Sequence, residues 1–247
     1  GIVEEINSLR TNPKRYASKI LNYTKYFKGN VLRLPGAFLG IQTAEGAKAY
    51  TDAVDFLEQQ DRIEGLEPSK GLCAIAEELL KKIQDYEDPS ELGRIDIDEI
   101  VAKYGAFKGI FSRAVDFGSD TPEQALINLI VCDGDRTRRQ RDSLLNIEFK
   151  RVGVASGKHS VYKKCCVIVY CSEFINSKDK NDKEYFGGSE INYRGGENRE
   201  YDTEEKEEVL RPRKVIIGKR KDDDEEEIKE KEKNRTDNLP KGYVSIR

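Results

Sequence analysis

The segment Cys165–Cys171 constrains the fold of this chain more than any other part of the sequence. It reads Cys-Cys-Val-Ile-Val-Tyr-Cys, a run of apolar, β-branched and aromatic residues typical of a strand. Side chains alternate between the two faces of a strand, so this one is apolar on both faces and needs cover on both. Helical patterns dominate the preceding sequence and can supply that cover. We therefore predict an α/β (α+β) fold: an αβα sandwich with a small, mostly antiparallel sheet between helices, followed by a charged extended tail.

The helices are predicted from apolar residues at three- and four-residue spacing and from start signals. A first helix spans residues 2–10, and Asn12 followed by Pro13 marks the start of a second. Thr43, Ser69, Asp96 and Thr121 are predicted to begin four further helices. The apolar stripes of these helices are expected to face the core.

A hairpin is predicted at the end of the folded part. Val152 and Val154 alternate in a first strand, residues 157–160 form a turn, and Val161–Tyr170 form the second strand. His159, the single histidine, falls in this turn and is expected to be an exposed loop residue. With one histidine, a multi-histidine metal site within this chain is excluded.

The composition changes after about residue 176, and we divide the chain into a domain over residues 1–174 and a tail over 175–247. Residues 178–184 are almost all charged, and residues 221–233 form a mixed charge run. The tail is predicted to be either solvated and disordered or an arm that lies along a partner. In the second case two apolar clusters would anchor it, formed by Val209, Leu210, Val215, Ile216 and Ile217.

Net charge and cysteine usage limit the class of protein. The net charge of −3 and the pI of about 5.6 predict no nucleic-acid partner, and no apolar run has the ~20 residues of a membrane span. The first residues do not have the pattern of a signal peptide, although a mature secreted protein would look the same. Five cysteines, three of them in one strand, favour buried reduced thiols in an intracellular protein over a disulfide framework.

Several segments, in order along the chain, match one known pattern. They are Glu4–Arg10 with Asn12-Pro13-Lys14, Glu45-Gly46, Gly71–Ala76, Lys103-Tyr104-Gly105, and above all Leu144-Leu145-Asn146 with Phe149–Ala155. Over roughly residues 1–174 the sequence resembles the CAP superfamily (the SCP-like domain), in its bacterial and protist branch. The resemblance implies an αβα sandwich.

The same resemblance implies a central cleft in which histidines and acids hold a divalent ion. In this alignment of motifs, Arg113 stands where the family has an acid and Gln140 where it has a histidine. Asp133 stands at a position that is also acidic in the family. A cation such as Arg113 would repel a metal ion. We expect a degenerate site with no metal, no other cofactor and no catalysis.

A cluster of arginines stands out before Leu144. It comprises Arg136, Arg138, Arg139 and Arg141. These residues are either a solvated helix start or a docking patch for an acidic partner surface.

The leading hypothesis is a non-catalytic interaction or scaffold module within a larger cytoplasmic assembly. An acidic polymer such as tubulin would suit the arginine cluster, which suggests a cytoskeletal or ciliary setting. The alternative is a secreted effector or lipid-binding member of the same family, which the sequons at Asn22 and Asn234 would fit. A hydrolase acting through His159 or Asp133 is the third hypothesis.

Overall fold

The computed structural model describes residues 1–37, 40–86, 93–177 and 215–216. Its main sheet has the strand order β4-β6-β7-β5, in which β4 (Glu67–Pro68) is parallel to β6 (Arg151–His159). The long strand β7 (Lys163–Asn176) pairs antiparallel with β6 and with β5 (Gly105–Phe117). The predicted apolar strand therefore lies inside a mostly antiparallel sheet.

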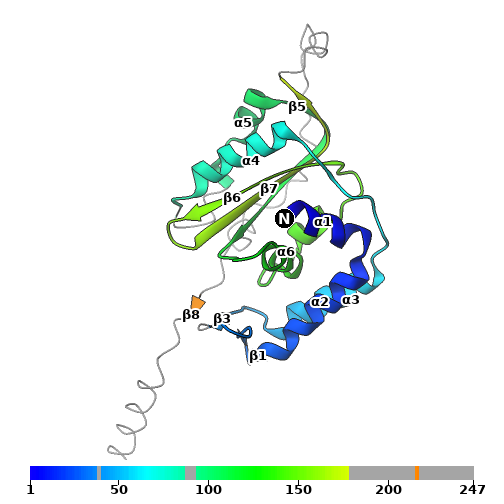
Figure 1. The fold of residues 1–247 in the computed structure, drawn as a ribbon, viewed down its shortest axis with the longest axis vertical. Helices are drawn as coiled ribbons and strands as arrows, with labels where there is room; N and C mark the ends of the chain where they lie inside the picture. Colours follow the sequence, from blue (N-terminus) through cyan, green and yellow to red (C-terminus); the bar gives the residue numbers. More distant parts are fainter. Residues whose placement is uncertain (38–39, 87–92, 178–214, 217–247) are drawn as a thin grey trace, which may run out of the picture.

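Helices cover both faces of this sheet (Figure 1). Val167 and Val169 of β7 share one core with α4 (Lys70–Ile83) and α5 (Ile97–Tyr104). Ile168 and Tyr170 enter the second core on the opposite face. That core is shared with α1 (Ile2–Thr11), α2 (Pro13–Tyr23), α3 (Ala47–Gln59), α6 (Pro122–Val131) and α7 (Arg139–Leu145). The predicted αβα sandwich is confirmed.

A second, smaller sheet lies beyond α2 and α3. It has the order β1-β2-β3-β8, with β1 (Phe27–Lys28), β2 (Val31–Leu32), β3 (Gly40–Gln42) and β8 (Val215–Ile216). A short 3-10 helix (Thr24–Tyr26) leads into β1. This sheet was not predicted, because its strands of two or three residues are too short to show alternation. The early strand β5 was also missed.

Most helix starts are where the capping residues predict them. The side chains of Asn12, Ser69, Asp96 and Thr121 each accept a hydrogen bond from a backbone N–H in the first turn of the following helix. The predicted start at Thr43 is wrong: α3 begins at Ala47, after Gly46 with φ of +67°. The Thr43 hydroxyl instead donates to the carbonyl oxygen of Asn30 at 2.6 Å, so it closes a turn.

The position of His159 also differs from the prediction. It is the last residue of β6, with 4% of its surface exposed, because the turn of the hairpin falls at residues 160–162. Its Nδ1 accepts hydrogen bonds from the N–H groups of Val161 and Tyr162, both at 3.2 Å, and Phe117 packs edge-on against the ring. Burial lowers the pKa of His159. The histidine therefore stabilises the end of the hairpin.

All five cysteines are free thiols, and four of them are buried. Burial raises the pKa of Cys132 to about 11 and that of Cys165 and Cys171 to about 12. The four buried thiols are therefore part of the packed core.

Of the tail, which begins at residue 175 in our division, the structure describes the end of β7, Ser177 and strand β8. β7 runs to Asn176, two residues past the predicted domain end. Val209, Leu210 and Ile217 lie outside the described residues.

Candidate functional site

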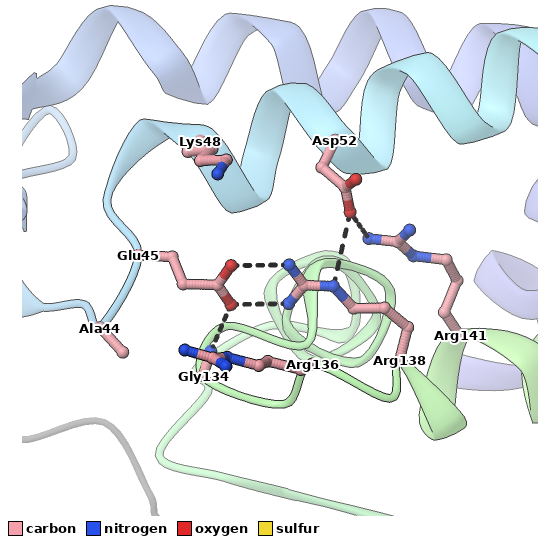
Figure 2. Close-up of a pocket in the computed structure, with 8 residues that line it drawn as sticks. All are labelled: Ala44, Glu45, Lys48, Asp52, Gly134, Arg136, Arg138 and Arg141. Atoms are coloured by element: carbon pink, nitrogen blue, oxygen red, sulfur yellow. Dashed lines mark hydrogen bonds and ion pairs between the residues drawn. The ribbon is translucent and has the colours of Figure 1, made fainter.

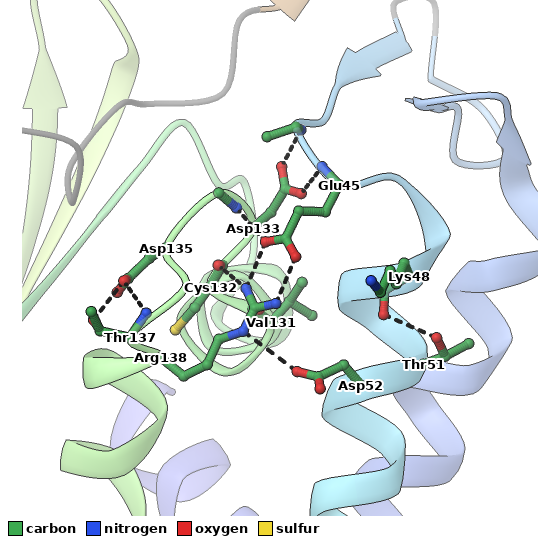
Figure 3. Close-up of polar contacts among 12 residues, drawn as sticks. Glu45, Lys48, Thr51, Asp52, Val131, Cys132, Asp133, Asp135, Thr137 and Arg138 are labelled. Atoms are coloured by element: carbon green, nitrogen blue, oxygen red, sulfur yellow. Dashed lines mark hydrogen bonds and ion pairs between the residues drawn. The ribbon is translucent and has the colours of Figure 1, made fainter.

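Two loops from distant parts of the sequence meet beside the amino-terminal end of α3 (Figure 3). Asp133, in the loop after α6, accepts hydrogen bonds from the N–H groups of Ala44 and Glu45 at 2.8 and 2.9 Å. In return, the Glu45 carboxylate accepts one from the N–H of Gly134 at 2.8 Å. Asp133 and Glu45 therefore join the two loops, each by accepting hydrogen bonds from backbone N–H groups of the other loop.

Arg138 makes the second connection between these loops. Its guanidinium binds both carboxylate oxygens of Glu45, at 2.8 and 2.7 Å, and donates to the carbonyl oxygen of Cys132 at 2.5 Å. The guanidinium holds the pKa of Glu45 below its ordinary value, and Glu45 raises the pKa of Arg138. A bidentate pair of this kind fixes the geometry of both side chains.

Arg141 is the innermost arginine, with 3% of its surface exposed. Its Nε donates to the carbonyl oxygen of Ile130 at 2.6 Å, and its Nη2 lies 3.1 Å from Asp52 Oδ2. The guanidinium carbon also lies 5.1 Å from the centre of the Phe56 ring. Asp52 additionally lies 3.4 Å from Nε of Arg138, so it bridges the two arginines.

The side chains that make these contacts line an open hollow with a volume of about 750 Å³ (Figure 2). Lys48 and Arg136 are exposed at it, and neither has an ion-pair partner among the described residues. Its lining combines four cations with two carboxylates: Ala44, Glu45, Lys48, Asp52, Gly134, Arg136, Arg138 and Arg141. The hollow is therefore a positively charged recess with two exposed cations.

The structure divides the predicted arginine cluster into different roles. Arg138 and Arg141 are held by internal partners, Arg139 is half-buried in the first turn of α7, and Arg136 alone of the four is exposed. Of the four arginines predicted to form a docking patch, only Arg136 is therefore exposed to a partner. Sequence reasoning missed Lys48 and Asp52 as site residues, although their spacing of four puts both on one face of α3.

The structure does not bring the predicted degenerate family site together. Arg113 is paired with Val169, on the sheet face that packs against α4 and α5. Its neighbour Ser112 faces the other way, and the Ser112 hydroxyl lies 3.1 Å from that of Ser143 in α7. Gln140 belongs to α7, so Arg113 and Gln140 lie on opposite sides of the sheet.

Neither a metal site nor a membrane span is found in the part of the chain that the structure describes. No three of its His, Cys, Asp and Glu side chains are grouped so that they could hold a metal ion. Likewise, no helix within the described ranges is long and apolar enough to cross a membrane.

The Glu45–Arg138 pair predicts a pH-dependent contribution to stability. The pKa of Glu45 is lower in the folded than in the unfolded chain, so its contribution is present above pH ~4.3 and is lost as the pH falls through the folded value. We expect Glu45→Gln to lower the free energy of unfolding by about 1–2 kcal/mol at pH 7. This difference should shrink progressively below pH ~4.3.

Urea denaturation of both proteins at pH 7 and at acidic pH measures this effect. The matched control is Glu58→Gln, an exposed position of the same helix, which should change the free energy by no more than about 0.5 kcal/mol. Equal stability of Glu45→Gln and the parent chain at pH 7 would show that the pair contributes nothing.

Comparisons with known proteins leave the family open. No family model matches the chain, and no curated protein matches it. Among solved structures, it is similar to an outer surface protein from Borrelia burgdorferi, with a TM-score of 0.34 and 13% sequence identity. That similarity covers 45% of this chain and 80% of the other.

Proposed function

We propose that this chain is a non-catalytic interaction module of the CAP type that binds an acidic protein surface through the hollow. One observation carries the proposal. The carboxylates and arginines at the junction of the two loops are used in internal contacts, whereas Lys48 and Arg136 remain exposed at the hollow. Exposed cations beside side chains that are fixed by internal hydrogen bonds suit recognition by charge and shape rather than bond-breaking chemistry.

The two residues that the hydrolase hypothesis names, Asp133 and His159, have structural contacts that support a binding role instead. Asp133 is held by two backbone N–H groups, and His159 is buried at the end of the β6–β7 hairpin. A hydrolase with a serine or cysteine nucleophile activated by histidine needs the two side chains within hydrogen-bond reach, and the single histidine does not line the hollow. These placements support a binding role over the third hypothesis, a hydrolase.

The lining of the hollow favours an acidic partner. Four cations and two carboxylates line it, so its formal charge is +2, against −3 for the whole chain. A positive recess on an acidic protein directs carboxylate-rich surfaces to one place and repels them elsewhere. An acidic polymer such as tubulin has this chemistry. A structural role in a cytoskeletal or ciliary assembly within the cytoplasm is the setting we propose, and the buried free thiols support an intracellular location.

Binding of the full chain to an acidic polymer tests the proposal. Lys48→Gln with Arg136→Gln should weaken binding to fluorescent poly-L-glutamate about tenfold at low salt, because two exposed cations that face the ligand are removed. The same double variant should pellet less with polymerised tubulin in a co-sedimentation assay. The affinity of the parent chain should also fall as salt is added.

The matched control removes the same charge from the other side of the sheet. Lys81→Gln with Lys82→Gln changes two exposed lysines of α4 and should alter the affinity by less than about twofold. If both double variants lose affinity equally, binding depends on net charge alone and the hollow is not the docking site. No binding of the parent chain to either polymer would reject an acidic partner.

A further inference from the structure

The small sheet has an edge that is occupied by a remote part of the same chain. β3 pairs with β2 on one side, with Leu32 opposite Ile41. On its other side it pairs antiparallel with β8, with Gly40 opposite Ile216 and Ile41 opposite Val215. The strands β3 and β8 lie side by side in Figure 1. The partner strands β3 and β8 are far apart in the sequence, since Val215 lies 38 positions after Ser177.

The backbone contacts of β2 indicate which groups of β3 face β8. The N–H of Arg33 donates to the carbonyl oxygen of Tyr26, on the β1 side of β2. The N–H and C=O groups of successive residues point to opposite sides of a strand, so those of Leu32 point away from β1 and toward β3. Leu32 and its partner Ile41 therefore direct their N–H and C=O groups toward each other. The N–H of Thr43 donates to Asn30, which agrees with this alternation.

It follows that Gly40 and Gln42 turn their N–H and C=O groups away from β2, toward β8. In an antiparallel pair the two opposed residues share the same orientation, so the N–H of Ile216 faces Gly40 and that of Val215 points away from β3. Without β8, the groups of Gly40 and Gln42 would form an open sheet edge, a ready site for strand addition.

This edge is directly connected to the hollow. Gln42 is followed by Thr43, which hydrogen-bonds to Asn30, and then by Ala44 and Glu45, whose N–H groups are bound by Asp133. A strand that pairs with β3 therefore acts on the same loop that carries one side of the hollow.

We propose that the outer edge of β3 is a strand-docking site and that Val215–Ile216 of the same chain is its ligand. The docked strand holds the loop from Thr43 to Glu45 in place beside the hollow. The class of ligand is an extended peptide segment bound through its backbone. This site is additional to the acidic-partner site, and its test needs no acidic ligand.

Hydrogen–deuterium exchange of the full chain, followed by NMR at single amides, tests this assignment. Ile216→Pro removes the N–H that donates to the Gly40 carbonyl oxygen and so weakens the docking of β8 on β3. The amides of Gly40 and Gln42, which face β8, should then exchange at least about fivefold faster, the factor expected when docking is weakened by one backbone hydrogen bond. The amide of Ile41, which faces β2, should keep its rate. Val215→Pro is the matched control: its N–H points away from β3, and the exchange rates should change less than about twofold.

A cross-link provides a second measurement that does not depend on proline. Ile41→Cys with Val215→Cys, in a Cys73→Ser background, places two thiols at directly opposed positions and should give an intramolecular disulfide on mild oxidation. Ile41→Cys with Val209→Cys, six residues out of register, should not. If the Gly40 and Gln42 amides exchange equally fast in the parent chain and Ile216→Pro, and no 41–215 disulfide forms, the strand-docking site is rejected. Binding of poly-L-glutamate through Lys48 and Arg136 would be unaffected by that result.

Discussion

Replacing Arg10 with methionine is expected to lower the free energy of unfolding by about 3–5 kcal/mol. Arg10 is fully buried, and its guanidinium donates to the carbonyl oxygens of Glu64, Leu144, Asn146 and Phe149 at 2.7 to 3.2 Å. Methionine keeps much of the apolar stem but removes every donor. The four backbone carbonyl groups remain in the variant, and each loses the hydrogen bond that it accepts from Arg10.

Equilibrium urea unfolding of the full chain measures this loss. Arg15→Met is the matched control, because Arg15 is exposed on α2, and it should change the free energy by less than about 0.5 kcal/mol. Arg10→Lys should recover part of the stability, since one ammonium can reach only some of the four carbonyls. An unchanged urea midpoint for Arg10→Met would contradict the role of Arg10 as the connection between α1 and these loops.

Gly153→Ala is expected to have the next largest effect, a loss of about 3 kcal/mol or more. Gly153 lies in β6 under the first turn of α4, and a Cβ there would lie 2.1 Å from the carbonyl carbon of Leu72 and 2.4 Å from the nitrogen of Cys73. These are helix backbone atoms, so α4 would have to move away from the sheet. Thermal unfolding followed by circular dichroism measures the change.

Gly157→Ala is the control for this substitution. Gly157 lies four residues further along β6 on the same face, where a Cβ would meet only the Leu80 side chain, at 3.0 Å. Because that side chain can change its rotamer, we expect a loss of less than about 1 kcal/mol. Equal losses at both glycines would mean that close packing of α4 on β6 does not limit stability.

The sequence predicted the sandwich because its strongest patterns are local. Cys165–Cys171 is apolar on both faces, and it lies between two cores. Asn12, Ser69, Asp96 and Thr121 cap helices because capping depends on the three residues that follow. In each case the local structure is determined by residues that are close together in the sequence.

The failures occur where a distant partner decides the local structure. Thr43 has the chemistry of a helix cap, but its hydroxyl is held by Asn30 and the helix begins later. His159 follows a glycine by two residues, which favours a turn, yet pairing with β7 extends β6 through it. The strand β5 was missed because Gly105 and Gly109 interrupt its pattern, and it owes its length to pairing with β7.

The candidate site could be predicted only in part for the same reason. The arginine cluster was visible in the sequence, but Glu45 and Asp52 lie 93 and 89 residues from the arginines that they bind. Without those partners, a buried Arg141 cannot be distinguished from an exposed Arg136. The expected grouping of Arg113 with Gln140 failed because a shift of one residue along β5 reverses the face of the sheet.

The four carbonyl contacts of Arg10 also determine when the first helix can become fixed during synthesis on the ribosome. The last of its acceptors, Phe149, is made 139 residues after Arg10. At a translation rate of about 5–20 residues per second, roughly 7 to 28 s pass between the synthesis of Arg10 and that of Phe149. Until then the guanidinium of Arg10 lacks at least one of its carbonyl acceptors. Throughout that interval the apolar face of the helix is open to chaperones, so substitutions at Arg10 should increase the time that nascent chains remain bound to them.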